Sequence, residues 1–357
     1  MFTIGENEVF VSFTNEGEYY DFLKERERNT KRPIKTNKDI ILNFADEDAR
    51  ISVSVNGTTY PVADCAWVSL CAKIGIKGTG FHALSNSTKK KVVEEILGLK
   101  KDEETKIIII DEMIRATLSE GYNVLPCSSV IPQVIDILRQ EKGTVDFIDA
   151  QYSYIGTSAR LEIPDLQVLI NNVYNKKDTW VPGLIVSSSD TGFGAVSISP
   201  VWRNGNNILN FGLRDESVHL VHRGTGAIDE IQNRIPAIFA KLNKNAENIQ
   251  KQAHVKIKDV NTVLNSIQEK FPCFGYKDLK ILESIMSLRV AELCEEYEEY
   301  ASASGDTEPF AVTAYDILLV LMSYVDYLDA EEDKGKIQSW ETMIGKLFAD
   351  NMAKYDL

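Results

Sequence analysis

The stretch that decides the fold is Val181-Pro-Gly-Leu-Ile-Val-Ser-Ser-Ser-Asp-Thr-Gly192, and a second apolar stretch, Gly194–Trp202, follows it. Short apolar runs bounded by small and turn-forming residues are typical of neighbouring strands. We therefore expect strands at Gly183–Ser188 and Gly194–Trp202, with a turn around Gly192-Phe193-Gly194. A short turn joins antiparallel strands, so these residues predict the centre of a mainly antiparallel sheet.

The same reasoning, applied outward from this centre, predicts an α+β fold in which helices flank the sheet and a helical bundle region follows it. Further strands are expected at Glu8–Thr14, Arg50–Tyr60 (a hairpin that turns at Asn56-Gly57), Lys106–Glu112, Ile114–Leu118, Asp146–Tyr154, Ser158–Ile163, Ile208–Phe211 and Ser217–His222. Helices are expected from Asp64 to Ala72, from Ser85 or Ser87 to Leu97 with Gly98 as the stop, and at Ser128–Gln140 with Pro132 in the first turn.

The spacing of apolar residues becomes helical from Ala227 onward. Breaks are expected at Pro236, around Pro272–Gly275 and at Ser302–Pro309, with helices at Lys277–Ala301, Thr313–Asp329 and Ser339–Ala353. These patterns divide the chain into an N-terminal β-rich segment (1–60), an α+β core (61–256) and an acidic helical region (257–357).

Composition places the chain among ordinary folded proteins. It has 357 residues, a net charge of −14 and 44% hydrophobic residues, which argues against disorder, and its five cysteines are too few and too scattered for a disulfide scaffold. No apolar stretch reaches the roughly 18 to 20 residues of a membrane span, and MFTIGENEVF has no export signal. We expect a cytoplasmic protein with no membrane partner.

The charge is unevenly distributed along the chain. Residues 203–258 carry nine Lys/Arg against five Asp/Glu, or +4, whereas residues 277–357 carry seven against eighteen, or −11. A local basic face is therefore compatible with the negative total.

Aromatic and cationic residues alternate in the strand-rich part. Bases can stack on such aromatic rings while guanidinium groups contact phosphates, which predicts nucleic-acid binding by Trp202, Arg203, Arg214, His222 and Arg223. The alternative is that Trp180 and Trp202 are core residues of the sheet. A second cationic stretch, Lys24–Lys38, is expected to be a solvated loop or a mobile nucleic-acid arm. An anion-binding turn is expected just before the helix at Ala227, formed by Gly224, Thr225 and Gly226.

Several catalytic and metal motifs are excluded by their context. Asp190-Thr191-Gly192 lacks a second Asp-Thr/Ser-Gly segment, so we interpret it as a structural turn and not as half of an aspartic protease. His219 and His222 belong to a predicted strand, where residues three apart point to opposite faces, so they predict no metal site. No Walker motif and no Cys-x-x-Cys spacing occurs. The sequence therefore predicts no catalytic residues, no metal and no cofactor.

Several segments occur in an order that resembles a known family. They are Ala66-Trp67 with Lys73-Ile-Gly75, then Leu118-Ser-Glu-Gly-Tyr-Asn-Val-Leu-Pro126, then a helix at Val130–Leu138, then Val181–Gly192, and finally His222-Arg-Gly-Thr-Gly226. This order, over roughly residues 60 to 235, resembles the phage/plasmid-like protein family catalogued as domain of unknown function 932. Ser187-Ser188-Ser189 stands where Asn-Ser is usual in that family, and Asn204-Gly205 lacks the usual preceding Cys. The resemblance implies a phage, prophage or plasmid gene and a role in DNA metabolism, without established catalytic residues.

Two functions remain for a protein of this kind. The first is a nucleic-acid-binding accessory in replication or recombination, which acts on single strands through the predicted basic face. The second is a non-enzymatic protein–protein interaction module, either a virion-associated cargo protein or an inhibitor of a host system. In the second, the acidic helical region binds a host or phage protein or mediates self-assembly into a homo-oligomer. A continuous basic face on the sheet favours the first function, and an interrupted one favours the second.

Overall fold

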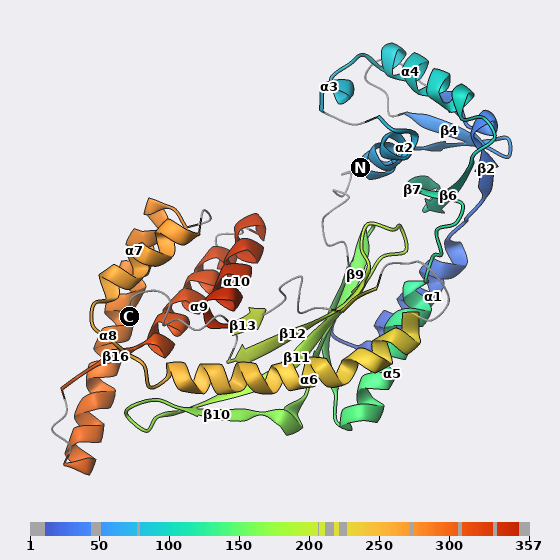
Figure 1. The fold of residues 1–357 in the computed structure, drawn as a ribbon. Helices are drawn as coiled ribbons and strands as arrows, with labels where there is room; N and C mark the ends of the chain where they lie inside the picture. The colour runs from blue at the N-terminus through green and yellow to red at the C-terminus, as the bar shows by residue number, and fades with distance from the viewer. Residues whose placement is uncertain are drawn as a thin grey trace.

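A computed structural model describes residues 11–43, 51–76, 79–205, 207–210, 218–220, 227–271, 274–305, 309–330 and 334–349. Within these residues an antiparallel sheet of eight strands forms the middle of the molecule, between a small N-terminal lobe and a group of C-terminal helices (Figure 1). The α+β class, with antiparallel sheets and a mostly helical C-terminal region, is therefore confirmed.

The central sheet has the strand order β1-β8-β9-β11-β12. At its far edge, β13 and β14 pair with opposite ends of β12, and β10 pairs with the first part of β11. The strands are β1 (Val11–Phe13), β8 (Asp146–Ser153), β9 (Gly156–Glu162), β10 (Val168–Asn171), β11 (Lys177–Ser188), β12 (Val196–Asn204), β13 (Asn207–Asn210) and β14 (Val218–Leu220). A short 3₁₀ helix, Pro164–Leu166, connects β9 to β10.

Alternation along the two longest strands decides which face of this sheet is buried. Trp180, Leu184 and Val186 of β11 are fully buried, as are Val196 and Ile198 of β12. Helices α1 (Glu16–Asn29), α5 (Cys127–Lys142) and α6 (Ala227–Gln252) contribute to the same core. The intervening side chains of both strands lie on the opposite face, because successive residues of a strand point to opposite sides.

The N-terminal lobe is inserted between α1 and α5 and has its own apolar core (Figure 1). It contains two three-stranded sheets, of order β2-β6-β7 and β3-β4-β5. Its elements are β2 (Ile34–Thr36), a 3₁₀ helix (Asn37–Asp39), β3 (Ile41–Asn43), β4 (Ser52–Val55), β5 (Thr58–Pro61), α2 (Asp64–Ile74), α3 (Thr79–His82), α4 (Asn86–Leu99), β6 (Glu104–Ile110) and β7 (Met113–Ser119). The predicted turn at Asn56-Gly57 joins β4 to β5, with a positive φ at both residues.

The described part of the C-terminal region forms four helices and one small two-stranded ladder. Its elements are β15 (Lys256–Ile257), α7 (Val260–Lys270), α8 (Tyr276–Ser304), β16 (Val312–Thr313), α9 (Ala314–Ala330) and α10 (Lys334–Ala349). The central position predicted for the apolar helix at 313–329 agrees with the complete burial of Ile317, Leu318 and Leu321 in α9. These side chains belong to the same large core as the sheet. The expected boundaries at residues 60 and 256 lie within β5 and β15, and the division into three domains stays a prediction.

Three predictions about where helices end or begin are wrong. Gly98 lies inside α4, which continues to Leu99. Pro132 is the sixth residue of α5 and not a first-turn residue, and Pro236 lies within an unbroken α6. A proline in a helix removes a backbone hydrogen bond and costs about 3 kcal/mol. Both prolines follow buried isoleucines, Ile131 and Ile235, in amphipathic helices, so burial offsets that loss.

The cationic stretch Lys24–Lys38 is neither a loop nor a mobile arm over most of its length. It forms the end of α1, strand β2 and the 3₁₀ helix that follows. Arg26 pairs with Asp111, and the Nη1 and Nη2 atoms of Arg32 donate to the carboxylate of Glu27, at 2.7 and 2.6 Å. Ordered secondary structure and internal ion pairs therefore replace the expected mobile segment.

Candidate functional site

Trp202 and Arg203 of the predicted nucleic-acid face point to opposite sides of the sheet. Trp202 is 1% exposed and belongs to the core, so its indole is not on a surface where a base can stack. Arg203 lies on the other side, where its Nη2 donates to Oε2 of Glu162 at 2.8 Å and its Nη1 donates to the carbonyl of Gly205 at 2.9 Å. Adjacent residues of a strand point to opposite faces, so Trp202 and Arg203 cannot form one binding surface. The alternative, that Trp202 is a core residue of the sheet, is correct.

The other predicted contacts, Arg214, His222 and Arg223, lie outside the described residues, as does the anion-binding turn of Gly224, Thr225 and Gly226. For these positions nucleic-acid and anion binding stay predictions. The Arg203–Glu162 ion pair nevertheless places an acid within the described part of the predicted face.

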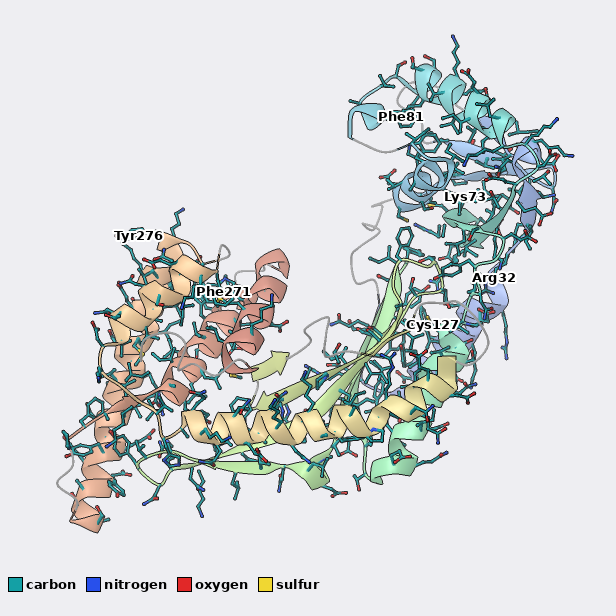
Figure 2. All side chains as sticks on the ribbon, in the orientation of Figure 1. Arg32, Lys73, Phe81, Cys127, Phe271 and Tyr276 are labelled. Carbon is teal, nitrogen blue, oxygen red and sulfur yellow. The ribbon has the colours of Figure 1, made fainter. Side chains whose placement is uncertain are left out.

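Asp190 confirms the interpretation of its segment as a structural turn. Its Oδ1 accepts a hydrogen bond from the backbone N–H of Cys127 at 2.7 Å, which ties the end of β11 to the start of α5. Figure 2 labels Cys127. Gly192 has a φ of +76°, and a Cβ there would overlap the side chain of Leu118. Burial raises the pKa of Asp190 although the hydrogen bonds from Cys127 oppose this, and burial also raises the pKa of the Cys127 thiol well above its usual range.

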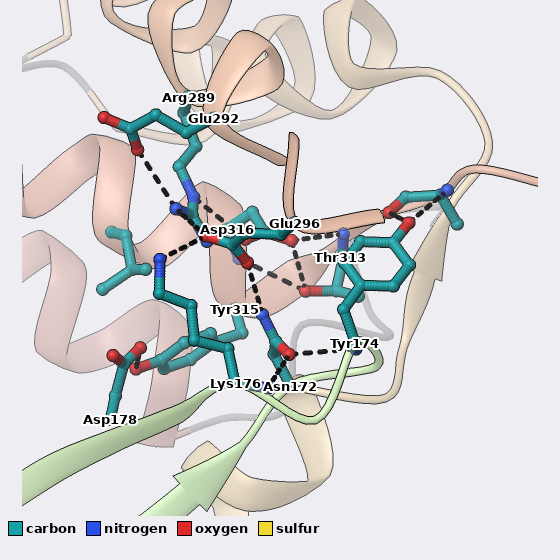
Figure 3. Close-up of polar contacts among 12 residues, drawn as sticks. Asn172, Tyr174, Lys176, Asp178, Arg289, Glu292, Glu296, Thr313, Tyr315 and Asp316 are labelled. Carbon is teal, nitrogen blue, oxygen red and sulfur yellow. Dashed lines mark hydrogen bonds and ion pairs between the residues drawn. The ribbon is translucent and has the colours of Figure 1, made fainter. Parts of the chain in front are cut away.

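A different group of residues, at the turn between β10 and β11, forms the best-organised polar site of the described chain. The Oδ1 atom of Asn172 accepts from the backbone N–H groups of Tyr174 and Lys176, at 2.9 Å each. Asn175 takes up a φ of +59° within this turn. The Nδ2 of Asn172 donates to Oε2 of Glu296 on α8 at 2.9 Å, so one amide both shapes the turn and attaches it to the helix (Figure 3).

Aromatic rings surround the turn. The ring of Tyr174 lies parallel to that of Phe310, 6.3 Å away, and its centroid is 5.6 Å from Tyr297 and 6.0 Å from Tyr300. The Tyr174 hydroxyl donates to the carbonyl of Ala311 at 2.8 Å and accepts from its N–H at 2.7 Å. These contacts fix the ring against the last turns of α8.

Arg289 lies at the centre of a charged network beside the turn (Figure 3). Its Nη2 donates to Asp316 at 2.9 Å, and its Nη1 donates to Glu296 and Glu292 at 3.1 Å each. The ammonium of Lys176 also pairs with Glu296, through its Oε1 atom, at 2.6 Å. Burial opposes ionisation of Glu296, but Lys176 and Arg289 together outweigh it and lower the pKa of this carboxyl.

The network continues into the start of α9. Asp316 is 1% exposed, and its Oδ2 accepts from the backbone N–H and the hydroxyl of Thr313, at 2.9 and 2.7 Å. The hydroxyl of Tyr315 donates to Asp178 at 2.7 Å and accepts from Nε1 of Trp180 at 2.9 Å. Helix α9 is thus joined to β11 through Tyr315, and α8 is joined to α9 through Arg289 and Asp316.

A pocket of about 530 Å³ opens beside this network, between the turn and the end of α8. Its α8 residues, spaced three or four apart, lie on one face of the helix. The pocket is lined by Tyr174, Asn175, Lys176, Glu296, Glu299, Tyr300, Ala303 and Ser304.

The sequence reasoning missed this site, although two of its signals were present. Thr313-Ala-Tyr-Asp316 before an apolar run is a capping-box pattern, and it forms the reciprocal contacts at the start of α9. The asparagines at 171, 172 and 175 are turn formers between two strands. Among the acidic residues of 295–299, Glu295, Glu298 and Glu299 are exposed, whereas the Glu296 side chain is only 10% exposed because it faces Arg289 and Lys176.

Within the residues that the structure describes, no three His, Cys, Asp or Glu side chains are grouped to hold a metal ion, and no helix is long and apolar enough to cross a membrane. The resemblance to the phage/plasmid-like family rests on the residues quoted above. A scan against protein-family models, a search of curated proteins and a search of solved structures found no match.

Proposed function

We propose that this chain is a protein–protein interaction module of a mobile element, and that its acidic helical region binds a basic partner protein. The resemblance to phage/plasmid-like proteins supports the genetic setting. The role in binding is supported by the charge of −11 over residues 277–357, which contrasts with +4 over residues 203–258.

The observation that carries this proposal is the exposed surface of α8. Glu295, Glu298 and Glu299 are exposed along its second half, and residues 290–305 contain no Lys or Arg. Leu288, about two turns before Glu295 on the same helix, is 69% exposed. An acidic surface next to an exposed apolar side chain fits a partner with complementary charge, because such charges steer association and select against acidic partners.

The predicted nucleic-acid face receives less support. Its aromatic residue Trp202 is buried, and its cation Arg203 already contacts Glu162. The experiment below therefore also measures nucleic-acid binding, as the result that would favour the other function.

The experiment is a fluorescence anisotropy titration of the full chain with four labelled probes: a lysine-rich peptide, a glutamate-rich peptide of the same length, a single-stranded oligonucleotide and a double-stranded oligonucleotide. We expect binding of the lysine-rich peptide alone, weakened by salt because screening shortens the reach of exposed charges. Oligonucleotide binding that falls log-linearly with salt, without peptide binding, would instead support the nucleic-acid function.

Two matched variants distinguish binding of the peptide at the α8 surface from its general attraction to an acidic protein. One variant combines Glu295→Gln, Glu298→Gln and Glu299→Gln. The other combines Asp102→Asn, Glu103→Gln and Glu120→Gln, at exposed positions of the N-terminal lobe. Both change the net charge by the same three units, so a loss of peptide affinity confined to the α8 variant supports the proposal. Equal losses would contradict it.

A further inference from the structure

The pocket at the end of α8 has the chemistry of a receptor for a positively charged side chain. We infer that it binds the ammonium or guanidinium group of a basic residue from the partner protein, an inference that rests on the interaction function proposed above.

The first argument is that the pocket already holds one ammonium group, from the chain itself. Lys176 reaches Oε1 of Glu296 at 2.6 Å across the space between the turn and α8. Asn172 and Arg289 also contact Glu296, so this carboxylate is fully engaged. The polar wall on this side is therefore preformed and does not need a ligand to order it.

The second argument is a carboxylate that the chain does not neutralise. Glu299 is three residues after Glu296 on the same helix face and lines the same pocket. It is exposed, and no cation of the described residues pairs with it. An incoming cation can therefore pair with Glu299 without displacing Lys176.

The third argument is the aromatic wall. Tyr174 and Tyr300 line the pocket, with their ring centroids 6.0 Å apart in a tilted arrangement. A cation over an aromatic face gains about 0.5–2 kcal/mol, and arginine and lysine both make this contact. The small residues Ala303 and Ser304 on the next helical turn leave the pocket open for a side chain.

The fourth argument is the end of the helix itself. Helix α8 ends at Ser304, with Gly305 in the left-handed region at its C-terminus, and its last turn contains no basic residue. The C-terminus of a helix carries a partial negative charge that favours a nearby cation. Carboxylate, aromatic rings and helix dipole thus favour the same kind of ligand at one place.

The test uses the lysine-rich peptide with single substitutions at adjacent glutamates. Glu299→Gln removes the carboxylate that lines the pocket, whereas Glu298→Gln removes an exposed carboxylate one residue away that does not line it. Because the two variants have the same net charge, long-range attraction is matched. We expect Glu299→Gln to raise the Kd for the peptide about fivefold, and Glu298→Gln to raise it less than twofold.

A second pair tests the aromatic wall. Tyr300→Leu is expected to weaken peptide binding about fivefold, while Tyr276→Leu, on the exposed first turn of the same helix, leaves it unchanged (Figure 2). Replacing the lysines of the peptide by norleucine is expected to abolish binding to the wild-type chain.

The outcomes distinguish this inference from the proposed function. If the peptide binds and the paired variants weaken it equally, the pocket is not the receptor, but the acidic surface still binds the partner. If the peptide does not bind the wild-type chain at all, both proposals fail.

Discussion

Replacing Arg289 by Met tests whether the buried charge network holds the C-terminal helices together. The Arg289 side chain is 12% exposed, and its contact Asp316 is 1% exposed, so methionine retains most of the packing but removes the positive charge that pairs with the aspartate. Removing one member of a buried ion pair costs about 3–5 kcal/mol. That is a large part of the roughly 5–15 kcal/mol by which domains are stable.

The contributions of the individual contacts show why Asp316 dominates this cost. Glu292 is 65% exposed, so its ion pair contributes close to nothing, in the range of about 0–1 kcal/mol for surface pairs. Glu296 keeps its contacts with Lys176 and Asn172 when Arg289 is removed. Among the described residues, Asp316 keeps only the two hydrogen bonds that its Oδ2 accepts from Thr313.

The assay is equilibrium urea unfolding combined with hydrogen exchange of the α9 amides. We expect Arg289→Met to lower the free energy of opening by about 3–5 kcal/mol. The matched control is Arg234→Met, which breaks an exposed i,i+4 pair with Glu230 on α6 and should cost at most about 0.5 kcal/mol. Adding Asp316→Asn to Arg289→Met should recover part of the loss, because it removes the uncompensated charge. A loss below about 1 kcal/mol, or no recovery in the double variant, would refute this reasoning.

Three other substitutions test the sheet and the helix starts. Asp190→Asn keeps the acceptor for the Cys127 N–H and removes a carboxyl whose pKa is raised by burial. The wild type loses stability as the pH rises through that pKa, because the buried carboxyl becomes charged, and the variant does not. We therefore expect a higher Tm for the variant at pH 7, and a difference that vanishes below about pH 4. Gly183→Ala places a Cβ against the carbonyl oxygen of Leu161 in the neighbouring strand, and we expect a loss of several kcal/mol, or insoluble protein, in expression and urea unfolding. Gly98→Ala, inside α4 with open space around the new methyl group, should raise the Tm by the equivalent of about 1 kcal/mol, and an unchanged Tm would contradict the helical assignment of this residue.

The fold class was predictable because it depends on patterns that are local in the sequence. The apolar runs at Gly183–Ser188 and Gly194–Trp202 predicted neighbouring antiparallel strands, and β11 and β12 pair there antiparallel. Ser85 was one of two expected caps, and its hydroxyl accepts from the N–H of Thr88 at the start of α4. Such signals act between residues a few positions apart, so one sequence is enough to find them.

The candidate site was not predictable in the same way, because its members come together only in the fold. Asn172 and Glu296 are 124 residues apart in the chain, and no spacing rule connects them. The error at Trp202 and Arg203 has a different origin. Trp202 was predicted to lie in a strand, but the consequence, that neighbouring residues of a strand point to opposite faces, was not applied to the predicted binding surface.

Helix α6 imposes a constraint on how this chain can change in length. Its 26 residues extend about 39 Å and contact β10, β12 and β14 of the sheet, α5 on one side and α9 and α10 on the other. One inserted or deleted residue in its middle would rotate the rest of the helix by about 100°. The side chains that make one set of these contacts would then face solvent. Insertions of seven residues nearly restore the phase, at the cost of a shift along the axis. Evolution of this protein is therefore expected to tolerate gained and lost residues in its turns, while the number of residues in α6 stays constant.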